Sequence, residues 1–193
     1  MLSISNAESV DIDDRIMTAA ASCLRDYGVE RVTLAEIARR AGVSRPTIYR
    51  RWPDTRAILA SLLTDRITGT WKSIPARRPG REGLVARIVE VARRLRDDEL
   101  IVSVLRSAPD LAMVYIAGRL GTSQQILIDL VEDELRAGQA DGSVRAGDVR
   151  QMSAMVLLIA QSSIQSAAIV ETILDTQALA IELARVLNGY LAP

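Results

Sequence analysis

The sequence predicts an all-α fold, in which a small N-terminal helical domain precedes a larger C-terminal helical bundle. Apolar residues recur at helical spacing along most of the 193 residues, and proline and glycine fall between the periodic segments. No segment shows the alternating pattern of a half-buried strand. We place the two domains at residues 1–53 and 54–193 and expect roughly the first ten residues to be disordered.

Capping residues divide the N-terminal part into four predicted helices. Thr33 followed by Glu36 matches a capping box, and Gly42 is a natural end for the helix that Thr33 begins. Ser44 can cap the next helix, which has Pro46 in its first turn, where a missing N–H costs little. The four predicted ranges are 12–27, 34–41, 45–52 and 55–72.

The remaining chain contains five more predicted helices. Residues 74–81 are expected to form a linker, and residues 138–147 a turn, because both stretches are rich in glycine, proline or small polar residues. The helices are predicted at 82–97, 98–107, 110–138, 148–171 and 175–191.

The charges are balanced overall but unevenly distributed. The chain has 24 basic and 24 acidic side chains, yet residues 31–96 hold 16 basic and 5 acidic ones, a net charge of +11. The flanking segments 1–30 and 97–193 carry −4 and −7. A basic block beside an acidic remainder indicates a module that binds a polyanion, and a solvated arginine-rich surface is the alternative.

The composition argues against an enzyme or a metal protein. There is no histidine, and Cys23 is the single cysteine. The sequence has no Walker loop, no GxGxxG, no GxSxG and no CxxC, so we expect no catalytic residue, no cofactor and no metal. The sequence shows no signal-peptide pattern, and we therefore expect a cytoplasmic protein.

Residues 151–170 contain no charged side chain. A membrane span is one interpretation, but seven glutamine and serine residues make this segment poorly suited to a hydrocarbon core. We therefore expect a buried or interfacial helix and no membrane partner.

The segment 33–52 carries the strongest functional signal. Its two short helices are separated by Ala41-Gly42-Val43-Ser44, which matches the turn of a helix-turn-helix. The second helix would be about 12 Å long, and the major groove of DNA is about 12 Å wide. Its outward side chains can contact bases or phosphates; they are Arg45, Thr47, Tyr49, Arg50 and Arg51. An αα-corner with solvated arginines is the structural alternative.

Three runs of this sequence resemble the N-terminal domain of the tetracycline-repressor (TetR) family. They are residues 28–38 (GVERVTLAEIA), 41–44 (AGVS) and 47–52 (TIYRRW). The resemblance covers about residues 12–60, and beyond residue 60 it consists of length and helical organisation alone.

The resemblance implies DNA-contacting roles for particular side chains. It implies that Thr33 contacts a phosphate at the start of the second helix, and that the third helix faces DNA through Ser44, Arg45, Pro46, Thr47, Tyr49, Arg50 and Arg51. The family often has lysine after the cap of the fourth helix, whereas this sequence has Thr55 followed by Arg56. The Thr55 hydroxyl and the helix N-terminus could still bind that phosphate.

The family resemblance also implies roles for the C-terminal bundle. It implies a homodimer through helices 148–171 and 175–191 and a pocket for a small, largely apolar effector. Candidate ligand contacts are Trp71, Tyr115, Gln124, Gln161 and Gln165, polar or amphipathic side chains within apolar helices. The expected function is a repressor that binds a palindromic double-stranded DNA operator and is released by its effector. A helical protein–protein adaptor is the alternative.

Overall fold

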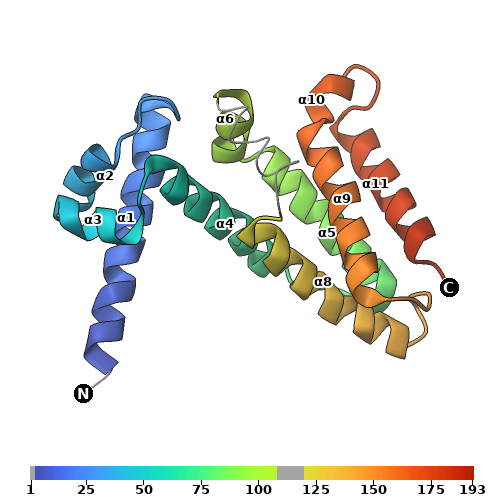
Figure 1. Ribbon diagram of the computed structural model, residues 1–193. Coiled ribbons are helices and arrows are strands. Elements are labelled where there is room, and N and C mark those ends of the chain that lie inside the picture. Colours follow the sequence, from blue (N-terminus) through green and yellow to red (C-terminus); the bar gives the residue numbers. More distant parts are fainter. Residues whose placement is uncertain (1–2, 108–119) are drawn as a thin grey trace. The chain divides into compact units, whose positions relative to one another are not determined.

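The computed structural model describes residues 3–107 and 120–193, and all regular structure in these ranges is α-helical (Figure 1). The predicted all-α class is therefore confirmed. The helices form two compact units: residues up to 65 with 99–107, and residues 66–98 with 120–193. The predicted boundary between residues 53 and 54 divides the chain by expected function, and it remains a prediction. Divided by packing, the first unit continues to Asp65.

The first unit contains α1 (Ser3–Tyr27), α2 (Leu34–Ala41), α3 (Arg45–Arg51), the first part of α4 (Thr55–Ser73) and α6 (Glu99–Ser107). In Figure 1, α2 and α3 lie against α1, which also contacts α6. Each of the first four helices contributes to one apolar core. Its fully buried members are Ile16, Cys23, Ile37, Ile48 and Ile58.

The helix α1 begins at Ser3, which is earlier than the predicted start near residue 12. Residues 3–11 are therefore helical, whereas the sequence predicts disorder for roughly the first ten residues. No proline or glycine interrupts the stretch 3–27, so nothing in the backbone chemistry stops the helix from extending toward the N-terminus.

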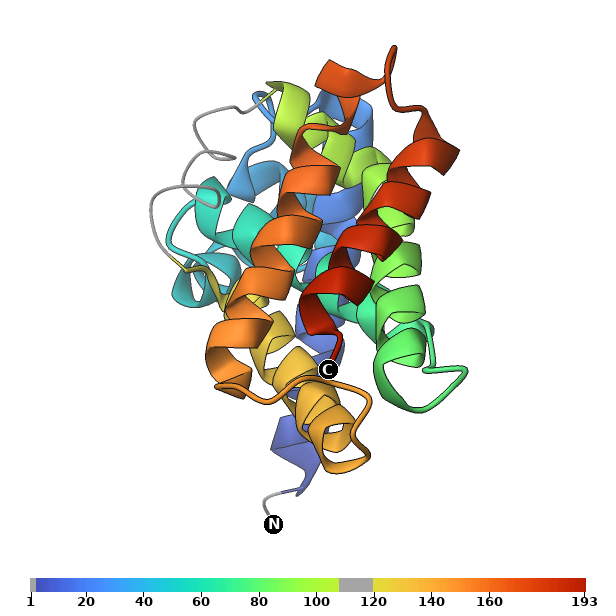
Figure 2. The ribbon, with the colours of Figure 1, turned by 90° about the vertical axis from the view of Figure 1, so that its right-hand side faces the viewer.

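The second unit is a bundle of α5 (Gly80–Arg96), α8 (Thr122–Ala140), α9 (Val149–Gln165), the short α10 (Ala167–Val170) and α11 (Thr176–Leu191), joined by the last part of α4. Figure 2 shows α9 and α11 side by side, and both helices contact α5. The bundle closes around fully buried apolar side chains, namely Leu84, Val85, Leu135, Met152, Val156, Leu187 and Leu191.

Two predicted helices have limits that differ from the expected ones. Residues 110–119 of the predicted helix 110–138 lie outside the described residues, and Gly121 has extended backbone angles (φ −79°, ψ 166°) just before α8. The Gln124 side chain accepts a hydrogen bond from the Gly121 N–H at 2.8 Å, so a local cap starts a new helix there. The predicted helix 148–171 ends at Ser166, where the backbone leaves the helical region (φ −100°, ψ 2°). Within the described ranges, no helix is both long and apolar enough to cross a membrane.

Arginine side chains hold the C-terminal end of α11. The Arg145 Nε donates to the Tyr190 carbonyl at 2.8 Å, and its guanidinium lies 4.7 Å from the centre of the Tyr190 ring. The Arg81 Nη1 donates to the Asn188 carbonyl at 3.4 Å. These carbonyls have no partner within their own helix, so the two arginines supply the missing hydrogen-bond donors. Their positive charges also interact favourably with the negative end of the helix dipole.

Gly83 permits a close approach that no other residue would allow. A Cβ at this position would lie 1.8 Å from the carbonyl oxygen of Arg78, so the loop before α5 runs directly over the first turn of that helix. Gly83→Ala is therefore expected to lower the free energy of unfolding by about 1–3 kcal/mol, as measured by urea denaturation. Gly69→Ala is the matched control, because a Cβ there meets nothing within 4 Å. Equal stability of the two variants would contradict this account.

Candidate nucleic-acid interface

The helix α2 is fixed at both ends by its own sequence. The Thr33 hydroxyl accepts a hydrogen bond from the Glu36 N–H at 3.2 Å, as the predicted capping box requires. At the other end Gly42 adopts a left-handed conformation (φ 65°), and the Val43 N–H returns to the Ala38 carbonyl at 3.0 Å. This geometry ends α2 sharply and turns the chain into α3.

The helix α3 begins and ends as the sequence predicts. The Ser44 side chain caps it by accepting from the Thr47 N–H at 3.3 Å, and the two hydroxyls lie 2.8 Å apart. Ile48 is fully buried and anchors the helix in the core. The Trp52 N–H closes the last turn on the Ile48 carbonyl at 2.9 Å, and its indole Nε1 donates to Ser61 of α4 at 2.9 Å.

Arg15 of α1 stabilises the turn between α2 and α3. Its Nη2 donates to the carbonyl oxygens of Ala41 and Gly42, at 2.8 and 3.3 Å. These carbonyls lie beyond the last hydrogen bond of α2, and a guanidinium satisfies both with one nitrogen. The relative orientation of α2 and α3 is thus fixed by a third helix.

The outer face of α3 is exposed and cationic. Arg45, Pro46, Tyr49 and Arg50 are exposed, Tyr49 to 51%, while Thr47 is half-buried beside its cap. Arg56, at the start of α4, is exposed as well. Within the described ranges Arg45, Arg50 and Arg56 form no ion pair, so their charge is available to an anionic partner.

Arg51 is placed differently from the prediction. Its side chain is only 19% exposed, and its Nε lies 2.5 Å from the Asp13 carboxylate on α1. The last residue of α3 therefore packs against α1 instead of lying on the exposed face. The register of a helix this short explains the difference, since Arg51 follows Ile48 by three residues and shares its inward side.

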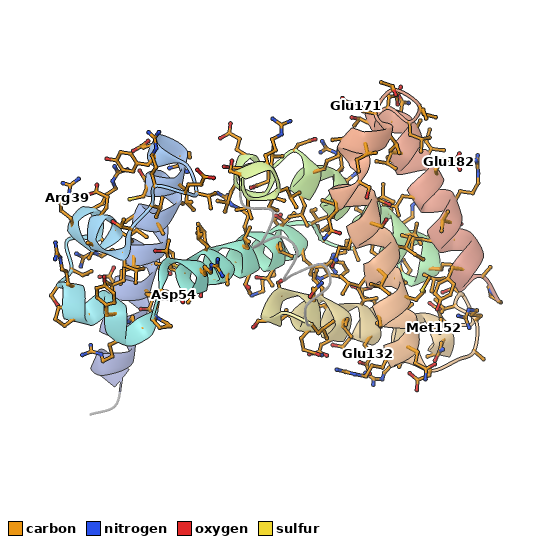
Figure 3. All side chains as sticks on the ribbon, turned by 45° about the horizontal axis from the view of Figure 1, so that its top comes forward. Arg39, Asp54, Glu132, Met152, Glu171 and Glu182 are labelled. Atoms are coloured by element: carbon orange, nitrogen blue, oxygen red, sulfur yellow. The ribbon has the colours of Figure 1, made fainter. Side chains whose placement is uncertain are left out.

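The basic residues at the end of α2 are largely paired. Arg39 donates to Glu36 at 2.6 and 2.9 Å, and this interaction lowers the pKa of the Glu36 carboxyl. Arg40 pairs with Asp26 of α1 and donates to the Ser22 hydroxyl at 2.8 Å. Figure 3 shows Arg39 on the outside of α2. Arg40 is thus mainly a link between α1 and α2.

Two predicted phosphate contacts lie at helix starts. Thr33 is exposed, and its hydroxyl is engaged by the Glu36 N–H. Thr55 is half-buried at the first position of α4. Asp54, labelled in Figure 3, caps this helix by accepting from the Ala57 N–H at 2.7 Å. A carboxylate at this helix N-terminus competes with a phosphate, so the geometry favours Thr33 over Thr55 as a phosphate contact.

The candidate ligand contacts fall into three groups. Gln124 of α8 and Gln161 of α9 are joined by a 2.6 Å hydrogen bond between their side-chain amides, and both are half-buried. Gln165 is half-buried in the last turn of α9. Trp71 is 3% exposed and lies under the guanidinium of Arg87. Tyr115 lies outside the described residues.

The first 60 or so residues match a known family of regulators. The model of the N-terminal domain described as "Bacterial regulatory proteins, tetR family" matches residues 16–62, which contain α2, α3 and the turn between them. The likeness extends to the whole chain in the HTH-type transcriptional regulator Rv2250c of Mycobacterium tuberculosis. The two are 61% identical over 191 residues, which cover 99% of this chain and 100% of the relative.

The chain belongs to the TetR family. It is therefore a DNA-binding transcriptional regulator and not an enzyme. TetR-family regulators bind DNA operators and small-molecule effectors and act as dimers. The exposed cationic face of α3 is accordingly the candidate DNA-contacting surface of this TetR-family regulator.

Solved structures share the fold of this TetR-family regulator over nearly its whole length. QsdR, a transcriptional repressor of the TetR family from R. erythropolis, has a TM-score of 0.70 at 17% identity, covering 94% of this chain and 96% of that one. FadR from Bacillus subtilis, solved in complex with stearoyl-CoA, has a TM-score of 0.62 at 21% identity, covering 92% and 98%. At these identities the likeness concerns the fold alone.

Sequence reasoning about this TetR-family regulator missed Arg15 and Arg87. Arg15 looks like one charged residue among the acidic neighbours that begin the amphipathic part of α1. Arg87 is recognisable in the sequence as an exception, because it interrupts the apolar positions of α5 between Leu84 and Ile88. A lone arginine within an apolar stripe indicates a buried partner, but only the structure identifies that partner.

Proposed function

We propose that this TetR-family regulator is a repressor that binds a palindromic operator as a homodimer and is released by a small, largely apolar effector. The observation that carries the proposal is the exposed face of α3, where Arg45, Tyr49 and Arg50 project from a helix capped at both ends and locked to α1 and α4. A rigid helix with unpaired arginines can read guanine edges in the major groove and bind phosphates. Because operators lie in the bacterial cytoplasm, we infer that it acts there.

The outward faces of α9 and α11 support a homodimer. Met155 and Leu158 of α9 are 43% and 57% exposed, and Ile181 and Val186 of α11 are 51% and 50% exposed. The opposite faces of both helices already fill the core, so these four side chains do not serve the fold of one chain. Two copies related by a two-fold axis would bury them against each other.

The paired amides of Gln124 and Gln161 support an effector site between α8 and α9. The Gln124 Oε1 accepts from the Gly121 N–H at 2.8 Å and its Nε2 donates to the Gln161 Oε1 at 2.6 Å, while the Gln161 amide nitrogen supplies two further N–H donors. Neighbouring positions on these helices are apolar, as in pockets where a few polar groups orient a mostly apolar ligand. We propose a largely apolar effector with one hydrogen-bonding group. Trp71 is less suited to this role, since Arg87 already covers its ring.

The effector would act by changing the separation of the two recognition helices. A dimer binds two half-sites about one helical turn apart only when its recognition helices have that spacing. The effector must bind the two arrangements with different affinities, or it shifts nothing. The helix α4 is the proposed lever, because it follows α3 directly and ends in the second unit.

Selection of bound sequences from a random duplex library tests the proposed function. We expect a palindrome with half-sites centred about one turn apart, bound with an affinity that falls steeply between two salt concentrations, because phosphate contacts release counterions. Binding without an enriched motif, or without salt dependence, would contradict the proposal and favour the adaptor. The protein used should be shown to be folded and free of co-purified ligand.

A further inference from the structure

Three side chains from different helices meet at the C-terminal end of α4. The Arg87 guanidinium of α5 lies 4.2 Å from the centre of the Trp71 ring. Its Nη2 donates to the Trp71 carbonyl oxygen at 3.0 Å, and its Nη1 donates to the Glu134 carboxylate of α8 at 2.7 Å. We call Trp71, Arg87 and Glu134 the α4 anchor.

The α4 anchor combines a buried ring with two half-buried charged side chains in a directional arrangement. Trp71 is 3% exposed, and the side chains of Arg87 and Glu134 are 13% and 30% exposed. The planar guanidinium uses one nitrogen for a helix-end carbonyl, another for a carboxylate and its face for an indole ring. Arg93, by contrast, pairs with Glu90 of its own helix while 45% exposed.

The anchor holds the end of a helix that begins beside the recognition helix. The helix α4 runs without interruption from Thr55 to Ser73, and its cap Asp54 follows the end of α3 by three residues. Because an α-helix is stiff over this length, contacts that hold its last turn act on the helix as a whole.

We propose that Arg87, held in place by Glu134, is a positioning residue for operator binding. It sets the angle between α4 and the helices α5 and α8. Through that angle it determines the separation of operator half-sites that the dimer can bind. This inference rests on the proposed function and adds to it a specific pair of residues that determines operator spacing.

Binding to operators of altered spacing tests this role. The selected operator is compared with two derivatives that have one base pair inserted or removed at the centre, which moves the half-sites by about 3.4 Å and rotates them by about 35°. The wild-type protein is expected to bind the altered operators at least about 30-fold more weakly, since mismatched half-sites lose contacts worth several kcal/mol. Arg87→Met is expected to reduce this discrimination to less than about fivefold.

Controls separate positioning from general stability. Arg93→Met removes an arginine from the same helix whose ion pairs among the described residues are with Glu90 and Asp97, and it should keep the wild-type discrimination. Arg87→Lys keeps the charge but loses the planar fork, so it should restore the discrimination only in part. If Arg87→Met does not fold, Glu134→Gln keeps the stacking and the carbonyl contact and should show an intermediate discrimination. Thermal melting and sedimentation report the fold and the dimer of each variant.

The outcomes distinguish this inference from the proposed function. If the wild-type protein enriches no palindrome, the proposed function fails. If it binds one with sharp spacing preference, and folded Arg87→Met or Glu134→Gln keeps that preference unchanged, the positioning role is wrong while the proposed function stands. An equal loss of preference in Arg93→Met would likewise contradict it.

Discussion

Arg45→Ala is expected to weaken binding to the selected operator by about two to four orders of magnitude, because a bidentate contact between arginine and guanine is worth about 1–3 kcal/mol and a dimer loses one such contact in each half-site. Arg45 is the first residue of α3, is exposed and forms no ion pair within the described ranges. Its loss should also relax the base preference at one position of each half-site. Fluorescence anisotropy with the operator and its single-base variants measures both effects.

Arg78→Ala controls for the loss of one positive charge. Arg78 precedes α5, lies on none of the helices α3, α9 and α11, and has a side chain that is 77% exposed beside Glu82. This variant should bind the operator as the wild-type protein does. Arg51→Ala provides a second comparison on the recognition helix itself, since Arg51 pairs with Asp13 and should affect stability more than base preference. If Arg45→Ala left both affinity and base preference intact, α3 would not be the reading helix.

Leu158→Glu is expected to convert the dimer to monomers and with it to abolish tight operator binding. Leu158 is 57% exposed on the apolar outer face of α9. In a two-fold interface each substitution acts twice, so burying two carboxylates in place of two leucines costs about 3–6 kcal/mol, or about two to four orders of magnitude in the dimer dissociation constant. Sedimentation velocity over a concentration series measures that constant.

Leu120→Glu is the matched control for the dimer prediction. Leu120 is 54% exposed, like Leu158, but it precedes α8 and lies on neither α9 nor α11. It should leave the dimer intact. An Ile181→Glu variant on α11 should behave as Leu158→Glu does. A Leu158→Glu protein that remains dimeric would show that another surface joins the two copies.

Local signals in the sequence predicted the recognition unit well. Thr33 and Ser44 cap their helices as expected, and Gly42 adopts the left-handed conformation that ends α2. Such features depend on neighbours within four residues, so the order of residue types carries them directly. The non-helical backbone at Gly121 and the end of α9 at Ser166 were not predicted. A side-chain cap and a weak helix end change the spacing of apolar residues in the sequence very little.

The roles of individual arginines depended on partners far along the chain. Arg45 and Arg51 look alike in the sequence, yet one is exposed and the other reaches Asp13, which lies on a different helix. The sequence predicts Trp71 as a candidate ligand contact, and the structure adds that its ring lies under the guanidinium of Arg87, sixteen residues later. An ion pair or a stacked ring between helices is specified by packing, which periodicity alone does not reveal.

The sequence by itself determined the helical class, the helix-turn-helix, its caps and the TetR family, because each follows from spacing and residue type over short ranges. Only the tertiary structure decided which arginines of the recognition unit are exposed and which hold the fold, and it alone brought Trp71, Arg87 and Glu134 together. The physical reason is that charge and hydrogen-bonding capacity are properties of a residue, whereas burial and pairing are properties of the neighbours that the fold places around it.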